Sequence, residues 1–140
     1  MFFIVNKNQV LLFAALILVI SGALAFSAFS DNGDVSLCRN FIISLGYEPE
    51  EQPFEVTTFS VPEGFGSVYE NYNALNREAG FDLTSLRGRT VTKMSFRLSG
   101  EEQLYANILI DNEKICGGDI CNPALSGFML PLTKRSENAA

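Results

Sequence analysis

Residues 89–98 read RTVTKMSFRL and residues 104–111 read LYANILID, and in both stretches apolar residues recur at every second position. Successive side chains of a β-strand point to opposite faces of a sheet, so this period of two predicts two strands. One face of each strand is expected to be buried and the other to meet water, as is typical of antiparallel sheets. A short turn at residues 111–113 leads into a third predicted strand, residues 114–120. These three successive strands decide the fold.

A helix before these strands has the clearest start signal in the chain. Residues 67–70 read SVYE, which matches a capping box, in which the Ser67 and Glu70 side chains bond free backbone N–H groups. The helix is expected over residues 68–79 and ends before Gly80. Its spacing predicts an inner face of Val68, Tyr72, Leu75 and Ala79, and an outer face of Glu70, Asn73, Arg77 and Glu78.

Two further elements complete the predicted domain. Asp34 can cap a short helix over residues 35–45, because apolar residues recur there at steps of three and four before Gly46. A strand is predicted over residues 54–61, which are rich in Val, Thr and Phe and end at Pro62. We therefore predict an α+β fold in which two helices pack on one face of a four-stranded antiparallel sheet.

The N-terminal region differs from the rest of the chain. Residues 8–30 carry no charge and are rich in apolar residues, and this length suits a helix that spans a bilayer. We predict a transmembrane anchor or signal segment over residues 1–30, an extracytoplasmic domain over residues 31–133 and a disordered tail over residues 134–140. Lys7 precedes the apolar segment, so the domain should face outward as part of a single-pass protein of the cell membrane. Small residues at positions 23–25 leave the alternative that the segment is cleaved and the domain is secreted.

The charge balance bears on the kind of partner. The chain has 16 acidic and 10 basic residues, and because Lys7 is the only charged residue before Asp31, the domain carries nine basic residues and a net charge of −7. Nucleic-acid binding depends on Lys and Arg that neutralise phosphates, so we expect no nucleic-acid partner.

The residues that usually carry catalysis are scarce. The chain has no histidine, so Ser-His-Asp and Cys-His nucleophile systems and the common zinc ligand sets are not available. We expect no catalytic activity, no metal and no cofactor. Cys38, Cys116 and Cys121 allow one disulfide in three pairings, which the sequence does not rank, and three reduced thiols are an equal alternative.

Two groups of residues are candidates for binding. A basic stripe on the polar face of the strand over residues 89–98 could hold an anionic polymer, a lipid headgroup or an acidic protein surface, and it consists of Arg89, Lys93 and Arg97. Pairing of this stripe with the domain's own glutamates is the simpler interpretation. Adjacent glycines in a strand mark a bulge or a close backbone approach, and here they belong to a second candidate group of Gly117, Gly118, Asp119 and Cys121. The Asp119 carboxylate would disfavour a thiolate at Cys121, which argues against an activated nucleophile.

Several short motifs resemble a known family when they are taken together. They are VYENYNAL at residues 68–75, GFDL at residues 80–83, RGR at residues 87–89, GGDIC at residues 117–121 and GFM at residues 127–129. This combination, which spans roughly residues 36–130, resembles Domain of Unknown Function 4830, a family of short bacterial proteins from Clostridia and their relatives. The resemblance implies an N-terminal membrane segment and no particular activity. The chain departs from the family pattern in a short link after Leu98 and in Leu130, where many relatives have His.

These observations lead to three hypotheses about function. The first is a noncatalytic, membrane-tethered binding or sensing module whose partner is an envelope protein or ligand that the sequence does not identify. The second is an envelope thiol or redox protein, or an enzyme, centred on Cys121. The third is a structural subunit of a membrane protein complex that uses the apolar segment as its contact surface.

Overall fold

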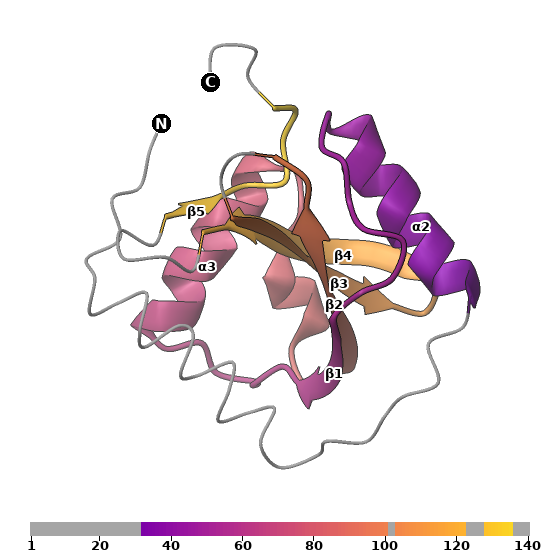
Figure 1. Cartoon of the computed structure of the whole chain (residues 1–140). Coiled ribbons are helices and arrows are strands. Elements are labelled where there is room, and N and C mark those ends of the chain that lie inside the picture. Colours follow the sequence, from indigo (N-terminus) through magenta and orange to yellow (C-terminus); the bar gives the residue numbers. More distant parts are fainter. Residues whose placement is uncertain (1–31, 101–102, 123–127, 136–140) are drawn as a thin grey trace.

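The computed structural model describes residues 32–100, 103–122 and 128–135, which form one α+β domain (Figure 1). The predicted anchor over residues 1–30 and the end of the predicted tail lie outside these residues. In the part of the chain that the structure describes, no helix has the length and hydrophobicity needed to cross a membrane. The elements are α2 (Asn32–Ser44), β1 (Glu55–Ser60), α3 (Ser67–Glu78), the 3-10 helix η1 (Leu83–Leu86), β2 (Thr90–Leu98), β3 (Leu104–Asp111), β4 (Lys114–Cys121) and β5 (Met129–Leu130).

The sheet has five strands in the order β1-β2-β3-β4-β5, and all neighbouring strands are antiparallel. The four predicted strands are confirmed to within one or two residues at each end. The prediction of only four strands is wrong, because Met129 and Leu130 pair with Cys121 and Ile120 and add a short fifth strand. Two residues are too few to show a period of two in the sequence.

The two helices lie on opposite faces of the sheet, so the prediction that they share one face is wrong (Figure 1). Cross-strand partners point to the same face, and Met94 and Ile108 are partners that pack in one core cluster with Ile42 of α2. Val91 and Leu109, at odd positions, pack in a second cluster with residues of α3 and η1. The sheet is therefore the middle layer of three.

The sequence predicts that the second face meets water, because it contains polar residues, and this prediction is wrong for the middle of β2. Lys93 and Ser95 have only 8% and 1% of their surfaces exposed, and both lie on the face that α3 covers. Alternation of polar and apolar residues shows which side chains share a face, but it does not show whether a polar face is covered. The strand β2 is consequently buried on both sides.

The helices confirm most of the sequence prediction. In α2 the side chains of Val35, Cys38 and Ile42 are buried, as their spacing predicts. In α3 Tyr72 and Leu75 are buried, again as predicted. Asn73, which was expected to face water, is buried instead.

The predicted capping box at the start of α3 is wrong. The N-cap is Gly66, no side chain caps the helix, and the Glu70 N–H donates to the Gly66 carbonyl oxygen. Ser67 is thus the first helical residue rather than the cap. A glycine can take the N-cap position, although it supplies no side-chain acceptor.

The β3-β4 hairpin has two irregular backbone features. Asn112 and Glu113 both have positive φ, at 49° and 61°, as a two-residue type I′ turn requires. The register shifts between Leu109 and Ile110, so Cys116 is an extra residue just before the paired glycines. This bulge and the close approach of Gly117 and Gly118 confirm the interpretation of the glycine pair.

The fold predicts a large cost for a side chain at Gly118. Its φ is +141°, and a Cβ atom there would overlap the backbone of Asn107 on the neighbouring strand. We expect Gly118→Ala to lower the free energy of unfolding by about 3 kcal/mol or more, because strain and overpacking add. Urea unfolding of the full chain in mild detergent measures this loss.

Gly64→Ala is the matched control, since a Cβ at Gly64 meets no atom within 4 Å. It should change the unfolding free energy by less than about 1 kcal/mol. Equal effects of the two substitutions would contradict the close approach.

Candidate functional site

Three polar side chains form a row across the middle of the sheet, beneath α3. Ser95, Asn107 and Asp119 are directly paired neighbours on β2, β3 and β4. The Ser95 hydroxyl donates to Asn107 Oδ1 at 2.6 Å, and Asn107 Nδ2 donates to Asp119 Oδ1 at 3.0 Å. Asn107 thus uses its carbonyl toward one neighbour and its amide toward the other. Antiparallel register alone brings these three residues together.

Asp119 also joins the row to α3. The Tyr72 hydroxyl donates to Asp119 Oδ2 at 2.6 Å, so each carboxylate oxygen accepts one hydrogen bond. Asp119 has 1% of its surface exposed. Burial raises the pKa of this carboxyl, and the bonds from Tyr72 and Asn107 and the charge of Lys93 oppose that rise. Burial and the neighbouring carboxylate raise the pKa of Tyr72 well above its ordinary value.

Asn76 makes a second connection between α3 and β4. Its Nδ2 donates to the Tyr72 carbonyl oxygen at 2.9 Å, and its Oδ1 accepts from the Gly118 N–H at 2.8 Å. Gly117 has no Cβ in the space where Asn76 Oδ1 lies. Gly117 therefore leaves room for α3 to pack, whereas a Cβ at Gly118 would meet Asn107 of β3 and Leu132. Both glycines are buried.

Cys121 lies at the edge of this network without being activated by it. Asn107 Nδ2 lies 3.3 Å from Cys121 Sγ and donates to it. Burial, followed by the nearby Asp119 carboxylate, raises the pKa of Cys121 to about 12. Because the thiolate is the nucleophile, this environment disfavours nucleophilic chemistry at neutral pH.

The three thiols are free in the structure. Burial raises the pKa of Cys38 to about 12 and that of Cys116 to about 11. A Cys116–Cys121 bridge would need a turn after Ile120, but β4 stays extended through Cys121. Five residues of strand span roughly 16 Å, which is too far for a disulfide.

The predicted basic stripe is not continuous. Lys93 is buried beneath α3, whereas Arg89 and Arg97 are exposed on either side of it. Arg89 Nε lies 3.0 Å from Asp111 Oδ2, and Arg97 Nη1 lies 3.9 Å from Glu50 Oε2. The arginines therefore pair with acidic residues of the same domain, and only Arg97 pairs with a glutamate.

Arg97 belongs to an exposed cluster that the sequence did not reveal. Its guanidinium lies 4.4 Å from the centre of the Phe54 ring, and the Phe54 and Tyr105 rings are 4.9 Å apart. We call Glu50, Phe54, Arg97 and Tyr105 the Arg97 cluster. Arg97 and Tyr105 are cross-strand partners, but Phe54 and Glu50 come from the loop before β1, and no local pattern predicts that they meet.

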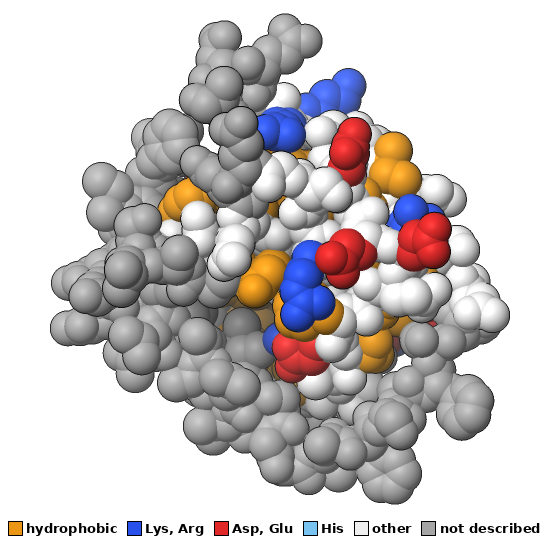
Figure 2. All heavy atoms as spheres, in the orientation of Figure 1, with side chains coloured by type: hydrophobic (Ala, Val, Ile, Leu, Met, Phe, Trp, Pro, Cys, Tyr) orange, Lys and Arg blue, Asp and Glu red, His pale blue; other side chains and the backbone are white. Residues whose placement is uncertain are grey.

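The face of the domain drawn in Figure 2 has no single field of charge. Figure 2 shows acidic and basic side chains interspersed on the face in view, with apolar side chains between them. A mixed surface of this kind gives solubility without selecting a polyanion.

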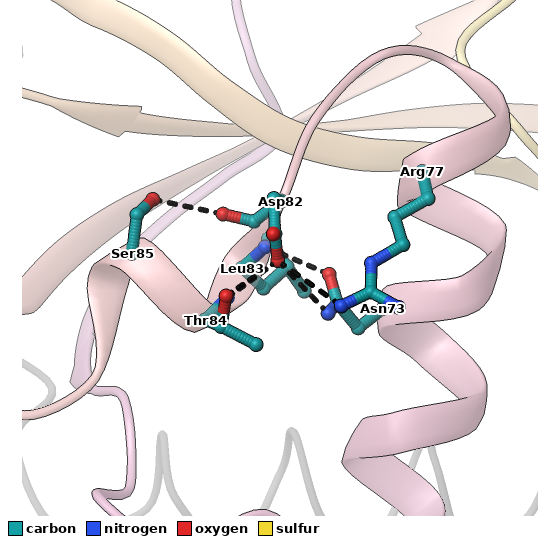
Figure 3. A network of polar contacts seen from close by, with 6 residues as sticks. All are labelled: Asn73, Arg77, Asp82, Leu83, Thr84 and Ser85. Atoms are coloured by element: carbon teal, nitrogen blue, oxygen red, sulfur yellow. Dashed lines mark hydrogen bonds and ion pairs between the residues drawn. The ribbon is translucent and has the colours of Figure 1, made fainter.

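A second polar network joins the C-terminal part of α3 to η1 (Figure 3). Asp82 Oδ1 accepts from the Thr84 N–H at 3.0 Å, from the Thr84 hydroxyl at 2.7 Å and from Asn73 Nδ2 at 3.1 Å. Asn73 Oδ1 accepts from the Leu83 N–H at 2.7 Å, which explains why Asn73 is buried. The sequence Asp82-Leu83-Thr84 is a local capping signal that our sequence prediction missed.

The described residues contain no group of three or more Cys, Asp or Glu side chains placed to hold a metal ion. No protein-family model, curated protein or solved structure matches this chain. The resemblance to Domain of Unknown Function 4830 stays a prediction.

The buried Asp119 predicts an unusual dependence of stability on pH. The pKa of Asp119 in the folded chain is raised above the ordinary value of 3.8. At pH values between 3.8 and the raised pKa, the folded chain therefore binds more protons than the unfolded chain. The free energy of unfolding should therefore fall as pH rises through this window. Asp119→Asn should reduce that fall by about 1.4 kcal/mol for each unit by which the pKa is raised.

Urea unfolding of both full-length proteins from pH 3.5 upward measures the difference. Asp34→Asn is the control for the loss of one negative charge. If the difference in unfolding free energy between Asp119→Asn and the wild type does not change with pH, the raised pKa of Asp119 is contradicted.

Asp82 predicts the opposite behaviour at lower pH. The bonds from Thr84, then the bond from Asn73, lower its pKa from 3.8 to about 2. The stability that Asp82 contributes is present above pH 3.8 and is lost as pH falls through 2. In a plot of the thermal unfolding temperature (Tm) against pH, Asp82→Asn should therefore make the fall of Tm at low pH less steep. The slope of the plot above pH 5 should stay unchanged. An equally steep fall of Tm at low pH in the variant and the wild type would rule out this role.

Proposed function

We propose that this chain is a noncatalytic binding or sensing module that residues 8–30 hold at the outer side of a cell membrane. The tether rests on the length and hydrophobicity of that uncharged segment. The noncatalytic assignment is supported by the environments of Cys121, Tyr72 and Asp119, which are bonded to one another or to Asn107. Tyr72 and Asp119 are buried, and Cys121 is partly buried.

The Arg97 cluster is the observation that supports binding most directly. Arginine and aromatic side chains are the residue types that contribute most to protein interfaces. Phe54 keeps 37% of its surface exposed, and the side chains of Arg97 and Glu50 are each 52% exposed. An exposed ion pair at 3.9 Å contributes little, so Arg97 can exchange Glu50 for a carboxylate of a partner at small cost.

The partner that fits this cluster is an envelope protein with an acidic group beside an apolar surface. The ring of Phe54 would supply the buried contact, and Arg97 the charged bond at its edge. Arg89 is less available for binding, because its ion pair with Asp111 is 3.0 Å long and the Asp111 side chain is mostly buried.

Photocrosslinking in membranes of the host tests the proposal. A photoreactive residue in place of Phe54 should give one discrete adduct with a partner, and Arg97→Ala should weaken that adduct several-fold. Arg89→Ala is the matched control and should leave it unchanged. Absence of an adduct, or equal loss with both arginine variants, would contradict the assignment of this surface.

The mass of the chain in membrane and culture fractions tests the tether separately. An intact N-terminus in the membrane fraction is the expected result. A chain in the medium that begins near Phe26 would show that the segment is cleaved and the domain is secreted. This outcome would contradict the tether, but it would not affect the crosslinking result.

A further inference from the structure

The exposed side of α2 carries no charged residue. Its exposed residues are Asn32, Gly33, Ser36, Leu37, Asn40, Ile43 and Ser44. At about 100° per residue, they occupy one arc of roughly 140° around the helix axis. Asp34 and Arg39 are partly buried and lie outside the two margins of this arc, and Arg39 Nε donates to the Glu50 carbonyl oxygen. We call this arc the uncharged face of α2.

The uncharged face also holds exposed apolar side chains. Among the described residues, the large hydrophobic side chains that are exposed are Leu37 at 37%, Ile43 at 49% and Phe54 at 37%. Two of these three are on α2, although the domain as a whole carries a net charge of −7. Leu37 and Ile43 lie near the two margins of this face, roughly 120° apart around the axis, with Ser36, Asn40 and Ser44 between them.

The position of α2 in the chain indicates which surface it contacts. The uncharged segment ends at Ser30, two residues before Asn32. Two residues of extended chain reach at most about 7 Å. The headgroup layer on each side of a bilayer is about 5–7 Å thick, so a spanning segment that ends at Ser30 places the first turn of α2 within or beside that layer. This step rests on the tether in the proposed function.

We infer that α2 lies along the outer surface of the membrane with its uncharged face toward the lipid. Leu37 and Ile43 enter the boundary between headgroups and acyl chains, as apolar residues of interfacial helices do. Ser36, Asn40 and Ser44 lie between them; Ser36 and Asn40 can donate hydrogen bonds to phosphate and ester oxygens, whereas the Ser44 hydroxyl donates to the Phe41 carbonyl oxygen.

The orientation has a consequence for the rest of the domain. α2 and α3 lie on opposite faces of the sheet, and Arg97 lies on the α3 face, in the same alternation as Ser95. With α2 on the membrane, the Arg97 and Tyr105 side chains lie on the sheet face directed away from it, while Glu50 is joined to α2 by the bond from Arg39.

Depth-dependent fluorescence quenching tests the inference. A polarity-sensitive fluorophore is attached to Leu37→Cys or Ile43→Cys in the full chain, which is reconstituted in vesicles of phosphatidylethanolamine and phosphatidylglycerol. Brominated lipids should quench both labels to a similar extent. Glu78→Cys, on the exposed side of α3, is the control and should be quenched several-fold less. The unsubstituted chain measures background labelling of the three native thiols.

The two labelled positions also distinguish a flat helix from an upright one. They are six residues apart, which is about 9 Å along the axis. Strong quenching at Leu37 with weak quenching at Ile43 would mean an upright helix and would overturn the inference. So would quenching equal to that at Glu78, or disulfide crosslinking of Ile43→Cys between two copies.

A second variant and an extraction step separate this inference from the tether. Leu37→Ser with Ile43→Ser changes only exposed side chains, and it should reduce quenching of a label at Asn40→Cys while urea unfolding stays the same. Chain that resists alkaline extraction but shows no quenching would overturn the α2 contact alone. Chain that alkaline extraction removes would overturn the tether and, with it, this inference.

Discussion

The carboxylate of Asp119 can be buried because Tyr72 and Asn107 each donate a hydrogen bond to one of its oxygens. A buried charge without partners costs far more than a domain of this size can offset. Tyr72 belongs to α3 and Asn107 to the middle of the sheet, so the same two bonds hold the helix against the strands. Gly117 makes this possible, since a Cβ there would occupy the space of Asn76 Oδ1 on α3, and the Gly118 N–H donates to the same oxygen. The packing of one layer thus depends on one carboxylate and two glycines.

The sequence predicted the strands well and the layers poorly. The period of two in residues 89–98 and 104–111 is a local property of the chain. It predicts the two strands correctly, because they pair with each other along nearly their whole length. Which face α3 covers depends on bonds between Tyr72 and Asp119, 47 positions apart, and no local period contains that information. Lys93, Ser95 and Asn73 looked solvent-facing for the same reason: their covering partners come from other parts of the chain.

The candidate sites divide in the same way. The glycine pair was recognised from its type and neighbours, and the structure shows the bulge and the close approach expected there. The prediction of an exposed basic stripe is wrong at Lys93, which is buried. A charged residue at every fourth position of a strand does not ensure that each one is exposed. The Arg97 cluster was missed because Phe54 and Glu50 precede the strand and reach Arg97 through the folded loop. The sequence alone supplies the residue types, whereas burial decides which of them remain available.

The strands lie in the sheet in the order in which they occur in the chain. Each strand after β1 pairs with the strand that precedes it, so no strand has to wait for a later one before its first neighbour is present. Contacts between segments close in sequence carry a low entropic cost of loop closure, and such folds form quickly. A chain that leaves a narrow exit with its N-terminus first can therefore add the strands of this sheet one at a time. Loss of residues from the C-terminal end would remove β5, and then β4 with Asp119 and its bond to Tyr72, while β1, β2 and β3 would each keep their neighbouring strand in the chain.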